Sequence, residues 1–294
     1  MAMNSQTLSN EQVLIVGCGD IGRRFAEKLP DSYRSILGLR RNPWVDTGRL
    51  RYEQCDVTDA EQLDSVLKQS DFGVILVTMT PGARTDAGYE IAYVKTCKNL
   101  IAGLKKYQRK PRLLVFVSST GVYGQDDGSW VDEGALTQPK TFSGRRLLEA
   151  EQIILESGFV CIVARFSGIY GADRRRLIDQ VLHGRAQLSA QITNRIHIDD
   201  GVAALVHLVE LHRKGDVLAS IYVVTDSVPA PLKEVLTWLA QQLEKGLVAA
   251  PEGAMAELGN KSCSNQRLLA TGFRLSFPGY KEGYAAMLRE INSP

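Results

Sequence analysis

Short apolar runs rich in β-branched residues alternate with amphipathic stretches from residue 12 to about residue 166. Continuous apolar runs of this length are typical of strands buried on both faces of a parallel sheet, and 3.6-residue spacing between them indicates helices. The pattern predicts an α/β fold with a Rossmann-type, doubly wound parallel sheet. The predicted strands are residues 12–17, 35–39, 51–56, 73–79, 113–119 and 160–166.

Three of the predicted helices have recognisable features. Thr58 and Glu61 form a capping box ahead of the first of these helices. Residues 89–107 have apolar positions at helical spacing, and a helix from residue 144 ends at Gly158, a typical C-terminal cap.

The alternation loosens after residue 167, where we expect a strand and helix near residue 200, a strand at 220–226 and a helix from Pro231. The chain is therefore predicted to contain a Rossmann-type domain at 10–167. A smaller substrate-binding region is predicted at 168–294, with some segments returning to the sheet. Residues 243–265 are the expected linker, and their Leu and Val side chains predict that it packs.

Composition narrows the class of protein. The 294 residues are 44% hydrophobic and 23% charged with a net charge of +2, which is typical of a globular protein and does not favour nucleic acid as a partner. The one dense basic run, Arg174 to Arg176, is interpreted as a solvated helix start. Five scattered cysteines predict neither disulfides nor a metal site. We expect a cytoplasmic protein without a membrane partner, since no leader or apolar span is evident.

A glycine-rich loop follows the first predicted strand in the stretch VLIVGCGDIG. The first glycine permits a tight turn, the second lets backbone approach a pyrophosphate, and the third lets the helix lie close to the sheet. The start of the helix adds positive potential. The predicted dinucleotide-binding residues here are Gly17, Gly19, Asp20, Ile21 and Gly22.

The end of the second predicted strand distinguishes the two nicotinamide cofactors. NAD enzymes place an acidic residue there, whereas this chain reads GLRRNP. Arg40 and Arg41 can pair with a 2′-phosphate, which favours NADP while NAD stays open. Asp56 can accept a hydrogen bond from the adenine amino group or form an Asx turn. Thr78, at the end of the fourth strand, is a further candidate for the cofactor site.

Several separated motifs occur in the order and approximate spacing of one large enzyme group: GCGDIG, CDVTD, VFVSSTGVYG, ARFSGIYG and RIHIDD. The chain resembles the extended and atypical short-chain dehydrogenases/reductases, in particular the NAD(P)-dependent epimerase/dehydratase family. Its SGR stretch is similar to that of the YeeZ-like branch. The resemblance covers most of the chain and implies oxidoreductase or epimerase chemistry on a small hydroxylated or carbonyl substrate, with a nucleotide sugar as one candidate.

The resemblance also implies roles for matching residues. Ser119 corresponds to the hydroxyl residue that bonds the reacting oxygen of the substrate, although Ser118 and Thr120 adjoin it. His197 and Asp199 match a motif at the border of the two regions, and we interpret the histidine as structural. The helices at 89–107 and 144–157 match those that pair in family homodimers, while their apolar stripes can equally serve the core.

One family motif is missing. Members carry Tyr-x-x-x-Lys on a helix beside the cofactor, and counting back from Glu149 gives Thr141 and Arg145 instead. The i, i+4 spacing keeps both on one helical face. Arg145 can retain the ribose bond, but a threonine is a poor general acid because its hydroxyl cannot be tuned toward neutrality.

The candidate catalytic residues are therefore Ser119, Thr141 and Arg145, and Tyr123 and Tyr170 are expected to pack at strand ends. Two functions stay open: an NADP-dependent enzyme with an atypical active site, and a non-catalytic redox sensor that binds NADP(H).

Overall fold

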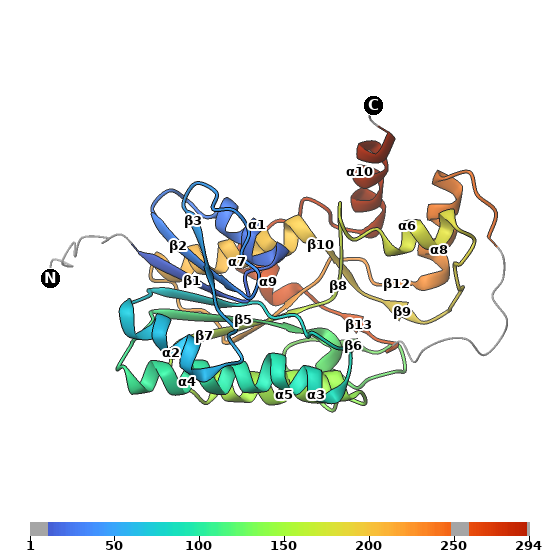
Figure 1. The fold of residues 1–294 in the computed structure, drawn as a ribbon. Coiled ribbons are helices and arrows are strands. Elements are labelled where there is room, and N and C mark those ends of the chain that lie inside the picture. Colours follow the sequence, from blue (N-terminus) through green and yellow to red (C-terminus); the bar gives the residue numbers. More distant parts are fainter. Residues whose placement is uncertain (1–10, 248–258, 293–294) are drawn as a thin grey trace, which may run out of the picture. The chain divides into compact units, whose positions relative to one another are not determined.

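The computed structural model describes residues 11–247 and 259–292. Figure 1 shows the course of the chain. In sequence order the strands are β1 (Gln12–Val16), β2 (Ser35–Arg40), β3 (Leu50–Gln54), β4 (Val74–Val77), β5 (Leu113–Ser119), β6 (Trp130–Val131), β7 (Cys161–Phe166), β8 (Gly168–Tyr170), β9 (Ile192–Thr193), β10 (Arg195–His197), β11 (Ile221–Val224), β12 (Ala230–Pro231) and β13 (Ser262–Cys263).

The α-helices of the described residues are α1 (Asp20–Lys28), α2 (Ala60–Gln69), α3 (Asp86–Tyr89), α4 (Thr96–Lys106), α5 (Phe142–Leu155), α6 (Arg176–Leu182), α7 (Ile198–Arg213), α8 (Leu232–Gln242), α9 (Gln266–Ala270) and α10 (Tyr280–Asn292). A π-helical segment, Glu90–Lys95, joins α3 to α4, and a 3₁₀ turn, Thr120–Val122, follows β5.

Seven strands form one sheet in the order β11-β7-β5-β4-β1-β2-β3. β1 pairs in parallel with β2 on one side and with β4 on the other. β2 and β3 therefore lie on one side of β1, and the strands of this sheet from β4 onward lie on the other. Every residue of β4 and β7 is buried, because helices cover both faces. The predicted α/β fold with a doubly wound parallel sheet is confirmed. Ligands bind such sheets at the carboxyl ends of the strands, where the order reverses.

Two local predictions were wrong. Asp59, and not Thr58, caps α2, because the Asp59 carboxylate accepts from the backbone N–H groups of Glu61 and Gln62. The helix expected at 89–107 is interrupted by the π-helical turn, in which Ala92, Tyr93 and Val94 are buried. A single inserted residue shifts the helical register, and sequence periodicity does not reveal it. The cap expected at Gly158 has the left-handed φ of +85° that favours glycine.

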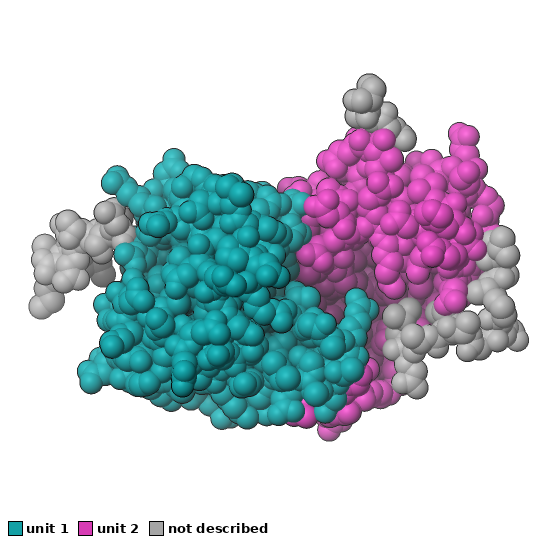
Figure 2. Space-filling view, in the orientation of Figure 1, with its two compact units in different colours: residues 1–117, 149–163, 205–220 teal, residues 118–148, 164–204, 221–294 magenta. Residues whose placement is uncertain are grey.

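The chain forms two compact units, which Figure 2 shows in different colours. Unit 1 comprises residues 1–117, 149–163 and 205–220, and unit 2 comprises residues 118–148, 164–204 and 221–294. Unit 2 has its own apolar core around α6, α8 and α10, centred on Val235, Leu236 and Leu239. The domain boundary at residue 167 stays a prediction, and residues 248–258 of the expected linker lie outside the described residues.

In the described part of the chain, none of the helices combines the length and apolar character that crossing a membrane requires.

Candidate functional site: a dinucleotide cavity and a separate polar site

The glycine loop after β1 has the backbone geometry that its sequence predicts. Gly17 has a φ of +79°, and a Cβ there would lie 2.5 Å from Met79 Sδ. A Cβ at Gly22 would lie 2.7 Å from Ile15 Cγ2 on β1, so this glycine lets α1 pack closely on the sheet. Both positions therefore require glycine for steric reasons.

The start of α1 is left open for an anion. Gly19 is the N-cap of the helix and provides no side-chain cap, and a Cβ at this residue would meet nothing within 4 Å. The acidic Asp20 in the first turn is bonded by Arg24 Nε at 2.8 Å, which offsets its negative charge. Backbone N–H groups and the helix dipole thus face space that a phosphate can occupy.

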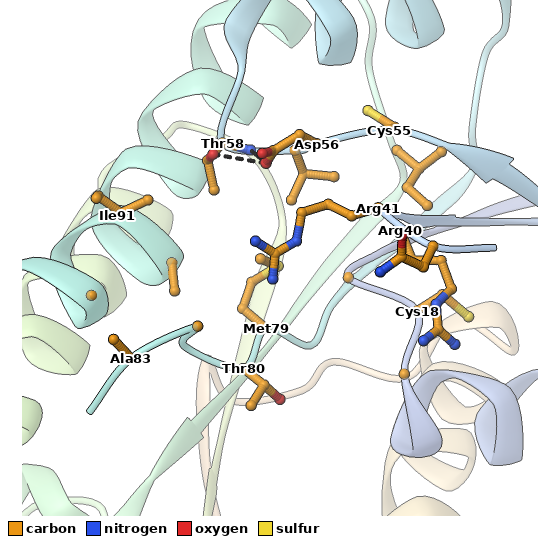
Figure 3. Close-up of a pocket in the computed structure, with 18 residues that line it drawn as sticks. Cys18, Arg40, Arg41, Cys55, Asp56, Thr58, Met79, Thr80, Ala83 and Ile91 are labelled. Carbon is orange, nitrogen blue, oxygen red and sulfur yellow. Dashed lines mark hydrogen bonds between the residues drawn. The ribbon is translucent and has the colours of Figure 1, made fainter. Parts of the chain in front are cut away.

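A cavity of about 430 Å³ lies beside this loop in unit 1. The segments that follow β1, β3 and β4 and the end of β2 contribute to it, as does the π-helical turn (Figure 3). Its size and its place at the carboxyl ends of the strands fit a dinucleotide. The lining residues are Gly17, Cys18, Gly19, Leu39, Arg40, Arg41, Asn42, Cys55, Asp56, Val57, Thr58, Met79, Thr80, Gly82, Ala83, Gly88, Ile91 and Ala92.

Two arginines supply the positive charge of this cavity. Arg41 is exposed and extends into the cavity in Figure 3, and its Nη2 would lie 3.8 Å from a Cβ at Gly82. Arg40 is half-buried with its guanidinium 3.6 Å from the centre of the Trp44 ring. Its Nη1 is buried without a hydrogen-bond partner among the described residues. A buried donor of this kind fits a negatively charged ligand group.

Asp56 and Thr78 differ in their access to the cavity. Asp56 lines it, yet its Oδ1 accepts from Thr58 N at 3.0 Å and from Thr58 Oγ1 at 2.7 Å, which is an Asx turn. Thr78 is buried and its N–H donates to Val16 O, while the neighbouring Met79 and Thr80 line the cavity. Of the other predicted residues, Asp20, Ile21 and Gly22 support the loop from α1 without lining the cavity.

Several residues that line the cavity were not predicted from the sequence. Met79 and Thr80 belong to the stretch TMTPGA directly after β4, and their position at a strand end was the available signal. Ile91 is exposed at the π-helical turn, and no sequence signal identified it because the helical periodicity of this segment predicts a continuous helix.

The predicted substrate-activating serine lies in unit 2, at the end of β5. Ser119 is half-buried, and its Oγ accepts from Gly121 N at 3.1 Å in the following 3₁₀ turn. Ser118 and Thr120 are both buried. Ser119 is therefore the most accessible of the three residues, and its hydroxyl also has a local capping role.

Thr141 and Arg145 lie at the beginning of α5. Thr141 Oγ1 accepts from Gly144 N at 3.1 Å, and its carbonyl accepts from Arg145 N at 3.1 Å. The threonine therefore acts as the N-cap of α5. Arg145 is exposed, with Nη1 donating to Lys140 O at 3.0 Å.

A close backbone contact links these two parts of unit 2. A Cβ on Gly144 would collide with the carbonyl oxygen of Gly121, so only glycine lets the start of α5 approach the turn after Ser119 so closely. The structure thus brings the neighbourhoods of Ser119 and Thr141 together. It does so without placing a tyrosine on α5.

Tyr123 and Tyr170 are both buried, which leaves their phenols little access to a substrate. Tyr123 is buried, burial raises its pKa to about 12, and Arg165 Nη1 donates to its oxygen at 2.9 Å. Burial also raises the pKa of Tyr170, which stacks on Tyr284 with ring centres 4.5 Å apart. Both tyrosines are buried in unit 2: Tyr170 ends β8, as expected, whereas Tyr123 follows the 3₁₀ turn after β5.

Unit 2 has a second, smaller cavity of about 110 Å³. Its wall includes the buried Arg195 and Tyr170, and Arg195 Nη1 and the Tyr170 hydroxyl have no hydrogen-bond partner among the described residues. Arg174 and Arg176 line it too, and they also line an adjoining open cavity of about 510 Å³ with Arg175 and Arg185. The basic run does begin a helix, α6, but it is only partly solvated.

His197 packs inside unit 2, and its structural role stays a prediction. It is buried, with its ring centre 4.1 Å from that of Phe277, and its Nδ1 accepts from Asp199 N at 3.3 Å. The next residue, Asp200, accepts from the backbone N–H groups of Ser276 and Phe277 at 2.9 and 2.8 Å. These contacts fasten the segment before α10 to the start of α7.

Comparison with solved structures gives matches over nearly the whole chain. A Methylobacillus flagellatus protein described as a candidate NAD-dependent epimerase/dehydratase is 35% identical, with a TM-score of 0.79 over 97% of this chain and 100% of that one. MoeE5, solved with UDP-glucuronic acid and NAD, is 22% identical, with a TM-score of 0.78 over 96% of this chain and 99% of that one.

UDP-glucuronic acid 4-epimerase from Bacillus cereus, solved with UDP-glucuronic acid and NAD, is 17% identical. Its TM-score is 0.79 over 95% of this chain and 100% of that one. At such identities these two likenesses concern the fold. None of the curated protein sequences matches this chain. Assignment to the YeeZ-like branch stays a prediction.

The sequence model of the NAD dependent epimerase/dehydratase family matches residues 13–224, which contain the glycine loop, both cavity arginines, Ser119 and the start of α5. This match covers well over half of the chain, and the 35% identical structure extends the likeness to nearly all of it. The chain belongs to the NAD-dependent epimerase/dehydratase family.

Proposed function

We propose that this protein binds NADP in preference to NAD and acts as an oxidoreductase or epimerase on a small hydroxylated or carbonyl substrate, with a nucleotide sugar as the leading candidate. The observation that carries the cofactor preference is the pair Arg40 and Arg41 at the cavity wall, where Arg40 keeps a buried donor without a partner among the described residues. A 2′-phosphate satisfies such a donor, whereas a ribose hydroxyl leaves the positive charge unpaired.

The substrate class is proposed from the polar cavities of unit 2. Arg195 and the neighbouring arginines suit an anionic group such as a diphosphate or a carboxylate. The 110 Å³ cavity holds only part of a ligand, and the adjoining open cavity can take the rest. UDP-sugars bound to MoeE5 and to the Bacillus cereus epimerase support this proposal.

The proposed chemistry assigns different tasks to the cofactor and the chain. A bound nicotinamide supplies a hydride donor or acceptor. Ser119 donates a hydrogen bond to the reacting oxygen of the substrate, and Arg145 provides positive charge beside the ribose. Thr141 holds the start of α5 and does not transfer a proton.

Titration calorimetry with NADPH and NADH at one ionic strength tests the cofactor preference. We expect NADPH to bind at least about tenfold more tightly, because one charge-assisted hydrogen bond contributes roughly 1.5–3 kcal/mol. Equal dissociation constants would contradict the proposal. Nucleotide sugars that raise the melting temperature in the presence of NADPH are then tested for turnover by product analysis.

The second candidate function is a non-catalytic NADP(H)-dependent redox sensor. The observation that favours it is the absence of a titratable phenol at Thr141, together with the raised pKa of Tyr123. A sensor binds NADPH and NADP with different consequences for a protein partner and converts none of the ligands that stabilise it. Product formation from any of them excludes this alternative.

A homodimer through α4 and α5 is also part of the proposal. The apolar stripe of α4, which includes Leu100, Ile101 and Leu104, is buried within the chain, so the outer faces of the helices would form the contact. A scattering mass near the 32.4 kDa of one chain at micromolar concentration would contradict a dimer.

A further inference from the structure

The loop between β2 and β3 folds back over the first cavity arginine. After Arg40 the chain runs through Trp44 and returns to β3 at Leu50. The Trp44 ring lies against the Arg40 guanidinium, with 3.6 Å between the guanidinium carbon and the ring centre. The arginine that the proposed function assigns to the 2′-phosphate is therefore already held by an aromatic side chain of its own loop.

The loop itself is anchored at its far end. Arg49 donates to the carbonyl oxygens of Leu29, Pro30 and Tyr33 at 2.7, 2.5 and 2.8 Å. Thr47 and Leu50 exchange two backbone hydrogen bonds of 3.0 and 2.9 Å. These bonds fix the return of the chain and limit the positions that Trp44 can adopt.

A second aromatic residue holds the indole from the side of β3. The rings of Trp44 and Tyr52 pack edge to face, with centres 6.0 Å apart and planes at 76°. Tyr52 N donates to Asp46 Oδ1 at 2.7 Å, which ties the middle of the loop to the strand. The Arg40 guanidinium thus stacks on the Trp44 ring, and Tyr52 supports that ring edge to face from β3.

The stack restricts a side chain that would otherwise have many rotamers. A free arginine loses rotamer entropy when it is fixed, and a guanidinium stacked on an indole has already lost much of it before a ligand binds. Since Nη1 of Arg40 remains buried without a partner in the described structure, the stack leaves hydrogen-bonding capacity available.

We propose that Trp44 is a positioning residue that sets the preference for NADP by holding the Arg40 guanidinium ready for the 2′-phosphate. This inference rests on the proposed NADP preference. The effect is specific to NADPH, because NADH has no 2′-phosphate for the prearranged guanidinium to meet.

The test is calorimetric measurement of both cofactors on the full chain with Trp44→Ala and Trp44→Phe. Trp44→Ala is expected to lower the NADPH affinity about tenfold and the NADH affinity less than about twofold, in line with the strength of cation–π contacts. Trp44→Phe keeps an aromatic face and should recover most of the preference. Trp130→Ala is the matched control, since Trp130 is 66% exposed and Trp44 is 44% exposed, and it should change neither affinity.

A double substitution separates positioning from a general effect on the fold. If Trp44 acts through Arg40, adding Trp44→Ala to Arg40→Ala should cause less than about a twofold further loss of NADPH affinity. A full tenfold further loss would overturn the inference. So would an unchanged NADPH-to-NADH affinity ratio in Trp44→Ala, or an equal fall in both affinities.

The two proposals fail in different ways. If the unmodified protein binds both cofactors equally, the proposed NADP preference fails, and this inference fails with it. If the unmodified protein prefers NADPH and Trp44→Ala keeps that preference, only the role of Trp44 is wrong. Thermal unfolding of each variant shows whether the loop substitution has altered the stability of the fold.

Discussion

The cavity beside the glycine loop of unit 1 and the start of α5 in unit 2 differ in how far they keep the features of their family. The cavity has the required glycines, an open helix start and two arginines. The start of α5 keeps the helix and the i, i+4 spacing but has Thr141 and Arg145 in place of the tyrosine and the lysine.

The difference reflects two kinds of chemistry. Dinucleotide binding depends on backbone geometry and positive charge, which survive many side-chain changes once the glycines are kept. Proton transfer depends on one group of suitable pKa, and an aliphatic hydroxyl cannot replace a phenol in that task. Substitutions in the two regions should therefore change different measured quantities.

The largest effect is expected at the glycine loop. Gly17→Ala places a Cβ 2.5 Å from Met79 Sδ at a φ of +79°, so it should lower the free energy of unfolding by at least about 1–2 kcal/mol and abolish cofactor binding. Gly19→Ala meets no atom within 4 Å and should leave stability unchanged while it weakens binding at least about tenfold. Denaturant unfolding and calorimetry check both, and unchanged binding in Gly19→Ala would contradict a pyrophosphate at this loop.

Reversal of charge at the end of β2 should have the next largest effect. Arg40→Asp is expected to reduce NADPH affinity by about tenfold or more and to narrow or reverse the preference over NADH, because a charge-assisted bond is replaced by repulsion. Calorimetry with both cofactors measures the change. Arg51→Asp on the exposed surface of β3 serves as a charge-matched control that should keep the preference.

Removal of the arginine on α5 should weaken binding of both cofactors. Arg145→Ala is expected to reduce NADPH and NADH affinities about equally, by up to about tenfold, because the proposed contact is with the nicotinamide ribose that the two share. Arg145→Lys should restore part of the loss, since it restores the positive charge. Affinities unchanged in Arg145→Ala would show that the arginine does not contact the cofactor.

The smallest effect is expected at Thr141. Thr141→Val removes the cap of α5 and should cost about 1 kcal/mol of stability, while Thr141→Ser keeps the cap and should be near neutral. Cofactor affinity should stay almost unchanged in both. General acid catalysis contributes about 10²–10⁴-fold, so a loss of turnover of that size in Thr141→Val would show that the threonine is catalytic.

The sequence by itself determined the parts of this protein that depend on neighbours along the chain. The buried strand β1, the turn at Gly17 and the arginines at the end of β2 follow from residues within a short stretch, since a βαβ unit is a local structure. The sequence also shows that position 141 has a threonine in place of the family's tyrosine, because helical spacing alone identifies that position.

Which distant residues contact one another was decided only by the tertiary structure. The stack of Trp44 on Arg40 depends on a loop held by Arg49, and the entry of Ile91 into the cavity depends on an extra residue in one helical turn. The cavity at Arg195 combines residues more than a hundred positions apart, from Gly168 to Tyr284. Local spacing cannot encode such contacts, because they form only when packed elements bring distant segments together and bury their polar groups.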